Sequence, residues 1–157
     1  MSETVYIETS ILGYLTARTT KNAIVASNIA LTKDWWELRR SAFTLYVSQL
    51  VMSEAARGDA EMAAARLKAI SGLPLLEVTS AVGELASQFM LRSNLPDKAS
   101  DDSIHIALAT VSQIDYLLTW NCKHIANAQL QKKLREISGD FGWTLPIICT
   151  PYELMGE

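Results

Sequence analysis

Residues 43–78, FTLYVSQLVMSEAARGDAEMAAARLKAISGLPLLEV, decide the fold class of this chain. The run from Phe43 to Ser48 is apolar and rich in strand-forming residues, which predicts a buried strand. An alanine-rich stretch from about Gln49 to Ile70 favours helix, and Gly58 weakens its middle enough to divide it in two. Leu75 to Val78 then predicts a third element, another short strand. A strand, a helical crossover and a second strand are typical of two parallel strands in an α/β fold.

The same alternation of strand and helix extends outward in both directions, without repeats or a linker that would divide the chain. Further strands are expected at residues 5–7, 116–119 and 147–149, and helices at about 22–40, 80–93, 101–111 and 128–137. Ser100 is placed to cap the helix that it precedes. The sequence therefore predicts a single α/β domain over residues 1–157, with a parallel sheet.

Composition excludes several classes of protein. The 157 residues are 49% hydrophobic and 20% charged, which indicates a folded globule and excludes a disordered chain. A net charge of −3 argues against a surface that coats nucleic acid broadly, although one cleft can differ in sign from the whole. Cys122 and Cys149 form no CxxC pair, which fits a reducing cytosol. With no signal-peptide pattern at the start and no run of about 18 apolar residues, we expect a cytoplasmic protein that is not in a membrane.

Acidic and amide side chains are expected at one edge of the sheet. Glu8 follows the first strand, Asn121 follows the fourth, and Glu54 lies about one helical turn beyond the second. Asp101 and Asp102 open a helix whose first turn should face the same edge. Because ligands of open parallel sheets bind beyond the carboxyl ends of the strands, these residues form the candidate site.

Two interpretations of these acids are open. Clustered carboxylates repel one another unless a cation compensates them, and oxygen ligands are those that Mg²⁺ and Mn²⁺ prefer. Such a site favours metal-assisted hydrolysis of a phosphate ester. The alternative is that each acid only stabilises the N-terminus of a helix.

Four short strings sharpen this choice: VYIETSIL at residues 5–12, VMSE at 51–54, DSIHIALA at 102–109 and LLTWN at 117–121. In order and spacing they resemble the motifs of PIN-domain ribonucleases of the VapC toxin type, across nearly the whole chain. The resemblance implies a three-layer α/β/α fold with a central, mostly parallel sheet of four to five strands. It also implies a metal-dependent endoribonuclease that uses Mg²⁺ or Mn²⁺, acts on RNA and pairs with a small antitoxin protein.

The resemblance assigns roles by position. The implied catalytic residues are Glu8, Glu54, Asp102 and Asn121, with Glu8 and Asp102 on the metal. The implied supporting residues are Ser10, Asp101 and Thr119. Two departures affect activity more than fold: Glu8 stands where Asp is more usual, and Asn121 stands where the family often has Asp.

These departures keep two other functions open. Because position 121 carries Asn and not a carboxylate, one alternative is a catalytically weak or inactive PIN-like module that binds RNA or protein. A phosphotransferase with an aspartyl nucleophile ranks last, because Glu8 occupies the position of that nucleophile and no Asp follows two residues on.

Three further residues carry expectations. His105 lies three residues after Asp102, hence on the same helix face, and we expect a partly buried, hydrogen-bonded histidine. Trp35 and Trp36 are adjacent on a helix, so both rings cannot face the core. One of them is expected at an interface, in a homodimer or an antitoxin groove.

Overall fold

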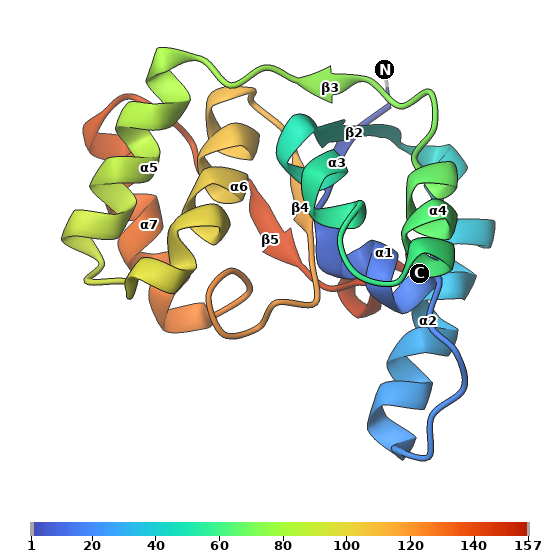
Figure 1. Ribbon diagram of the computed structural model, residues 1–157. Coiled ribbons are helices and arrows are strands. Elements are labelled where there is room, and N and C mark those ends of the chain that lie inside the picture. The colour runs from blue at the N-terminus through green and yellow to red at the C-terminus, as the bar shows by residue number, and fades with distance from the viewer. Residues whose placement is uncertain (1, 157) are drawn as a thin grey trace.

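A five-stranded sheet forms the centre of the computed structural model, which describes residues 2–156 (Figure 1). Its strands are β1 (Thr4–Ile7), β2 (Thr44–Ser48), β3 (Leu75–Leu76), β4 (Tyr116–Leu118) and β5 (Ile147–Cys149). They lie in the order β3-β2-β1-β4-β5, and every pair of neighbours is parallel. In the centre, Val5 is in register with Leu45 on one side and Tyr116 on the other. The expected parallel sheet is confirmed.

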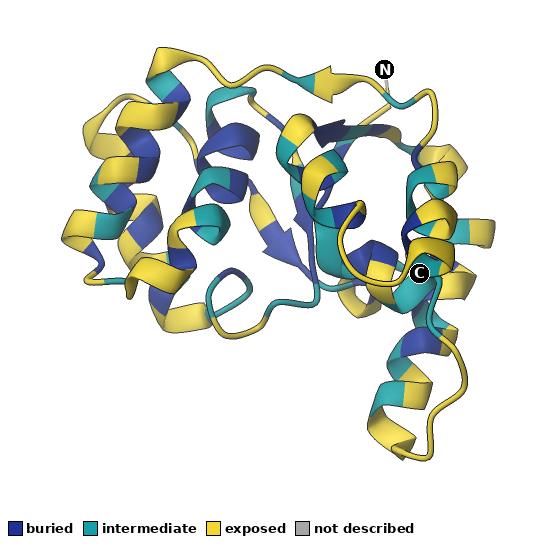
Figure 2. Ribbon diagram, viewed as in Figure 1, coloured by how far each residue is buried: buried dark blue, intermediate teal, exposed yellow. Residues whose placement is uncertain are grey.

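Helices cover both faces of the sheet. They are α1 (Thr9–Leu15), α2 (Ala23–Leu38), α3 (Gln49–Ala55), α4 (Ala60–Ala69), α5 (Ser80–Arg92), α6 (Ser100–Val111) and α7 (Ala128–Asp140), with 3₁₀ turns η1 (Arg40–Ala42), η2 (Asp97–Ala99) and η3 (Pro151–Leu154). Helices α1 to α4 lie on one side and α5 to α7 on the other (Figure 1). The buried side chains line the surfaces where these layers meet (Figure 2). This is the expected three-layer α/β/α architecture.

The order of the strands reverses between β1 and β4. From β1 the chain adds β2 and then β3 toward one edge, whereas β4 and β5 are added on the other side of β1. The connections on the two sides of this point diverge, and the crevice that they leave is where open α/β sheets bind ligands. Glu8 and Thr119 follow β1 and β4 directly, and the Glu8 N–H donates to the carbonyl of Leu118 at 3.1 Å.

Local sequence explains most of the element boundaries. Gly58 has a φ of +84°, a left-handed conformation that suits glycine, and it separates α3 from α4 as predicted. The side chain of Asn22 accepts hydrogen bonds from the first turn of α2.

The expectation that Ser100 caps α6 is wrong. Turn η2 runs directly into α6, so Ser100 already has helical φ and ψ of −57° and −47° and is the first residue of the helix. A capping residue needs an extended backbone, and the residue before the helix is Ala99, which has no side chain able to cap it.

The tryptophan pair divides as expected, one ring inward and one outward. Trp35 is fully buried, and its Nε1–H donates to the carbonyl of Leu154 at 3.0 Å. Trp36 is partly buried, and the Arg40 guanidinium lies 4.9 Å from its ring centre. Trp35 is therefore a core residue of its own chain, and only Trp36 remains a candidate for an interface.

Among the described residues, no helix combines the length and the apolar character that crossing a bilayer requires.

Candidate active site

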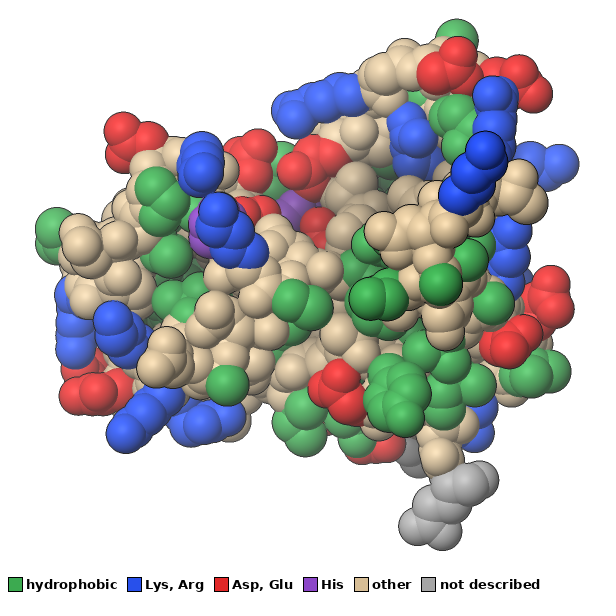
Figure 3. Space-filling model, turned by 90° about the horizontal axis from the view of Figure 1, so that it is seen from below, with side chains coloured by type: hydrophobic (Ala, Val, Ile, Leu, Met, Phe, Trp, Pro, Cys, Tyr) green, Lys and Arg blue, Asp and Glu red, His purple; other side chains and the backbone are tan. Residues whose placement is uncertain are grey.

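Residues from four elements meet at the crevice between β1 and β4. Glu8 follows β1, Thr119 follows β4, Glu54 comes from α3 and His105 from α6. The view from below shows Asp, Glu and His side chains together in a hollow, with Lys and Arg side chains on both sides of it (Figure 3). An acidic floor with basic flanks is therefore compatible with a phosphate-bearing ligand despite the overall net charge of −3.

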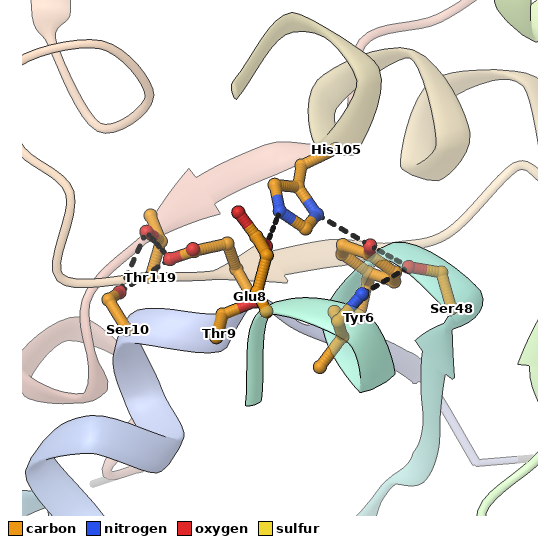
Figure 4. Close-up of polar contacts among 9 residues, drawn as sticks. Tyr6, Glu8, Thr9, Ser10, Ser48, His105 and Thr119 are labelled. Atoms are coloured by element: carbon orange, nitrogen blue, oxygen red, sulfur yellow. Dashed lines mark hydrogen bonds and ion pairs between the residues drawn. The ribbon is translucent and has the colours of Figure 1, made fainter. Parts of the chain in front are cut away.

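Glu8 is held by hydroxyl groups from two elements. It is only 5% exposed, and its Oε1 accepts hydrogen bonds from Ser10 Oγ and from Thr119 Oγ1, the latter at 2.6 Å. The backbone N–H of Trp120 donates to Ser10 Oγ at 2.8 Å, and the N–H of Asn121 donates to Thr119 Oγ1 at 2.9 Å. Figure 4 shows Ser10 and Thr119 side by side next to Glu8. Of the side chains that the structure describes, none donates to the second carboxylate oxygen of Glu8.

Glu54 is held in the same way from the other side. Its Oε1 accepts hydrogen bonds from Thr9 Oγ1 and His105 Nε2, both at 2.6 Å. Burial alone would raise the pKa of Glu54, but the hydrogen bond and positive charge of His105, together with the Thr9 bond, hold that pKa below its ordinary value. Glu54 is therefore a carboxylate at neutral pH. Each of Glu8 and Glu54 thus has one oxygen fixed by two donors.

His105 lies next to Glu54 and is fully buried. Its Nδ1 is 2.7 Å from Tyr6 Oη, which is in turn 2.7 Å from Ser48 Oγ (Figure 4). Burial lowers the pKa of His105, but the hydrogen bond to Glu54 and the charges of Glu8, Glu54 and Asp102 outweigh this, so the pKa lies above its ordinary value. Burial raises the pKa of Tyr6, which stays a neutral phenol.

Glu8, Glu54 and His105 each offer an atom able to bind a metal, and these atoms all lie within 4.8 Å of one another. Two carboxylates at this separation fit a hard divalent cation such as Mg²⁺ or Mn²⁺, which keeps several waters of its own. The donor set therefore fits the kind of ion that the sequence predicts.

The remaining predicted residues lie nearby but have other partners. Asp102 Oδ2 accepts a hydrogen bond from His124 Nδ1 at 3.1 Å, and Asp101 is half-buried in the first turn of α6. The Asn121 Oδ1 accepts from the backbone N–H groups of Lys123 and His124, at 3.3 and 2.9 Å, and so closes the turn after β4. The group within 4.8 Å thus pairs Glu8 with Glu54, whereas the sequence predicted that Glu8 and Asp102 hold the metal.

Sequence reasoning missed the partners of two acids. His105 was expected to be hydrogen-bonded and partly buried, and it is fully buried and bonds Glu54, which is 51 residues away in the chain. His124, to which no motif gave a role, bonds Asp102. The i, i+3 spacing correctly placed His105 on the face of α6 that carries Asp102. No local pattern indicated the contact with α3.

Comparison with known proteins supports the fold by structure alone. No family model and no curated protein sequence matches the chain. Among solved structures, the toxin VapC20 of Mycobacterium tuberculosis, described as cleaving the sarcin–ricin loop, superposes with a TM-score of 0.58. The match covers 76% of this chain and 92% of VapC20, with 17% sequence identity. The chain therefore shares its fold with a PIN-domain toxin, as the resemblance of its four short strings implied.

Proposed function

We propose that this protein is a metal-dependent endoribonuclease that hydrolyses phosphodiester bonds in RNA. The observation that carries the proposal is the pair Glu8 and Glu54, two carboxylates from different elements whose ligand atoms lie within 4.8 Å. Two negative charges this close at the floor of a crevice repel each other, and a divalent cation offsets that cost. The likeness in fold to a PIN-domain toxin supports the same reading.

Glu8 and Glu54 would hold the ion, with Asp102 as a third carboxylate on the adjacent face of α6. Bound Mg²⁺ or Mn²⁺ supplies activation of water and neutralisation of charge on the phosphate. Ser10 and Thr119 fix Glu8 by bonding one of its oxygens, and Thr9 does the same for Glu54. Of the side chains that the structure describes, none donates to the second oxygen of either carboxylate, which leaves both of these oxygens available to a ligand.

Asn121 has a different role in this proposal from the one its position suggests. Its side-chain oxygen accepts two backbone N–H groups, so it stabilises the turn after β4. That turn carries His124, which bonds Asp102. Asn121 therefore acts on the site through the turn, and Asp101, one residue before Asp102, adds negative charge at the rim.

RNA as the substrate class follows from two likenesses. The sequence resembles PIN-domain ribonucleases, and VapC20 is described as a toxin that cleaves the sarcin–ricin loop. A small antitoxin partner, a homodimer and a cytoplasmic location belong to the same proposal and rest on the resemblance alone.

The test is an RNA-cleavage assay with Mg²⁺, Mn²⁺ and EDTA, using the wild type and the variants Glu54→Gln and Asp102→Asn. Glu77→Gln serves as the matched control, because Glu77 is an exposed acid in the segment after β3. The proposal expects cleavage by the wild type and by Glu77→Gln, no cleavage with EDTA, and at most residual cleavage by the other two variants.

A wild type that binds RNA but cleaves none at millimolar Mn²⁺ would overturn the proposal in favour of the alternative, a non-catalytic binding module. Cleavage that persists in EDTA would overturn the dependence on metal.

A further inference from the structure

A chain of hydrogen bonds runs from the start of α3 through the core to the candidate site. The Val51 N–H donates to Ser48 Oγ at 3.2 Å, and Ser48 Oγ is 2.7 Å from Tyr6 Oη. Tyr6 Oη is 2.7 Å from His105 Nδ1, and His105 Nε2 donates to Glu54 at 2.6 Å. The side chains between its two ends, Ser48, Tyr6 and His105, are fully buried (Figure 4).

Burying this network costs free energy of folding, which points to a functional role for it. Polar side chains in a core are desolvated, and apolar side chains of similar size would pack there without that penalty. Each link is nevertheless bonded, so the network as a whole is satisfied. Within this network, the residue that reaches the crevice is Glu54, whose side chain is 18% exposed.

We propose that Tyr6 and His105 are positioning residues, which fix Glu54 for the divalent cation, and that His105 is not itself a ligand of that cation. The inference rests on the proposed function, because it concerns the ion that function requires. It adds two residues that no sequence motif assigned to the site.

The bonds of His105 argue against direct ligation. Nδ1 is occupied by Tyr6 at 2.7 Å and Nε2 by Glu54 at 2.6 Å, so both ring nitrogens already have partners. A cation on Nε2 would have to break the bond to Glu54 and leave that carboxylate with Thr9 alone.

The same bonds explain how His105 acts through Glu54. A glutamate has several rotamers, and at the edge of a crevice only bonded oxygens restrict it. His105 and Thr9 bond the same oxygen, Oε1, which turns Oε2 away from them. Tyr6 in turn fixes the imidazole, since its hydroxyl bonds the ring nitrogen opposite to the one that faces Glu54. Loss of either residue should leave Glu54 free to swing away from Glu8.

The test measures Mn²⁺ binding to the full chain by electron paramagnetic resonance, with a pulsed experiment for nitrogen coupling. Wild-type protein should bind Mn²⁺ with no ¹⁴N coupling from an imidazole. Tyr6→Phe and His105→Leu should weaken binding about ten- to a hundredfold, the usual effect of losing a residue that orients a ligand. His105→Gln should recover most of the affinity, because its amide can still donate to Glu54.

Thr110→Val is the control, since Thr110 is buried on the same helix but bonds only the carbonyl of Ile106. Its affinity should equal that of the wild type. Tyr6→Phe keeps the ring in place, so the test does not depend on whether His105→Leu folds.

Two outcomes overturn the inference and leave the proposed function intact. One is a ¹⁴N coupling in the wild type, which would make His105 a ligand. The other is unchanged affinity in Tyr6→Phe, or in a folded His105→Leu, while Glu8→Gln abolishes binding. A wild type that binds no Mn²⁺, or a Glu8→Gln variant that binds it as tightly, would instead overturn the metal centre, and this inference with it.

Discussion

The Nε2 atom of His105 lies 2.6 Å from Oε1 of Glu54, so a buried imidazole faces a carboxylate at the edge of the crevice. When it is protonated, His105 is a counter-ion for Glu8, Glu54 and Asp102, and the chain itself supplies it. The sequence suggested that only a bound cation offsets the repulsion among these acids. The hydrogen bond to Glu54 and the raised pKa of His105 indicate that a residue of the core supplies part of this compensation.

This pair should make stability depend on pH in a bell-shaped way. The pKa of His105 is raised above its ordinary 6.5, so its contribution is complete below pH 6.5 and is lost as the pH rises through the raised value. The pKa of Glu54 is lowered below its ordinary 4.5, so its contribution is complete above pH 4.5 and is lost as the pH falls through the lowered value. Both contributions are present together between pH 4.5 and 6.5.

The measurement is the free energy of unfolding of wild type and His105→Gln in denaturant, over a series of pH values. The difference between the two proteins should be largest between pH 4.5 and 6.5 and smaller on either side. A difference that is the same at every pH would show that the pair does not titrate in this way.

Added Mn²⁺ should raise the melting temperature of the wild type, because the ion binds the folded state and not the unfolded chain. Glu8→Gln and Asp102→Asn should each remove most of that rise, whereas Glu77→Gln should respond like the wild type. Differential scanning calorimetry with and without Mn²⁺ measures it. Equal rises in all four proteins would place the bound ion elsewhere.

Thr119→Val should destabilise the protein, because Thr119 is fully buried and donates to the carboxylate of Glu8. Loss of a hydrogen bond to a charged group costs about 1.5–3 kcal/mol of unfolding free energy. Urea denaturation measures the change. Thr110→Val, which loses only a bond within its own helix, should cost less. Similar losses in both variants would contradict the role of Thr119 at Glu8.

In the proposed homodimer, Trp36→Glu should shift the protein toward monomer without unfolding it, since Trp36 is the partly buried ring of the tryptophan pair. Sedimentation of wild type and variant measures the oligomeric state, and circular dichroism confirms the fold. Trp35→Glu should instead unfold the chain, because it places a charge in the core. A wild type that sediments as a monomer, with the same sedimentation coefficient as Trp36→Glu, would contradict a homodimer interface at Trp36.

Much of the fold could be predicted because its signals are local. The apolar run before Gln49 and the break at Gly58 each depend on a few neighbouring residues, and each appears in the structure where expected. The end of α7 was set too early, at Ile137, although Ser138 to Asp140 continue the helix. The buried Ser138 follows the neighbouring core residues, and packing outweighs its weak preference for helix.

The candidate site was predictable only in part, for the same reason. The resemblance of the motifs gave Ser10 and Thr119 supporting roles, and in the structure both hydrogen-bond Glu8. The partner of His105 depends on how the sheet brings α6 and α3, which lie on its opposite sides, to the same edge, and no local pattern encodes that arrangement. The position of Asn121 predicts a role in the site, but its side-chain oxygen accepts hydrogen bonds from two backbone N–H groups of its own turn.

The most direct test of the central claim is a crystal structure of the wild type with Mn²⁺, using anomalous scattering to locate the ion. The account predicts an anomalous peak in contact with the carboxylates of both Glu8 and Glu54, with His105 still bonded to Glu54. A fully occupied Mn²⁺ that touches neither carboxylate, or no peak in the crevice at saturating Mn²⁺, would contradict it.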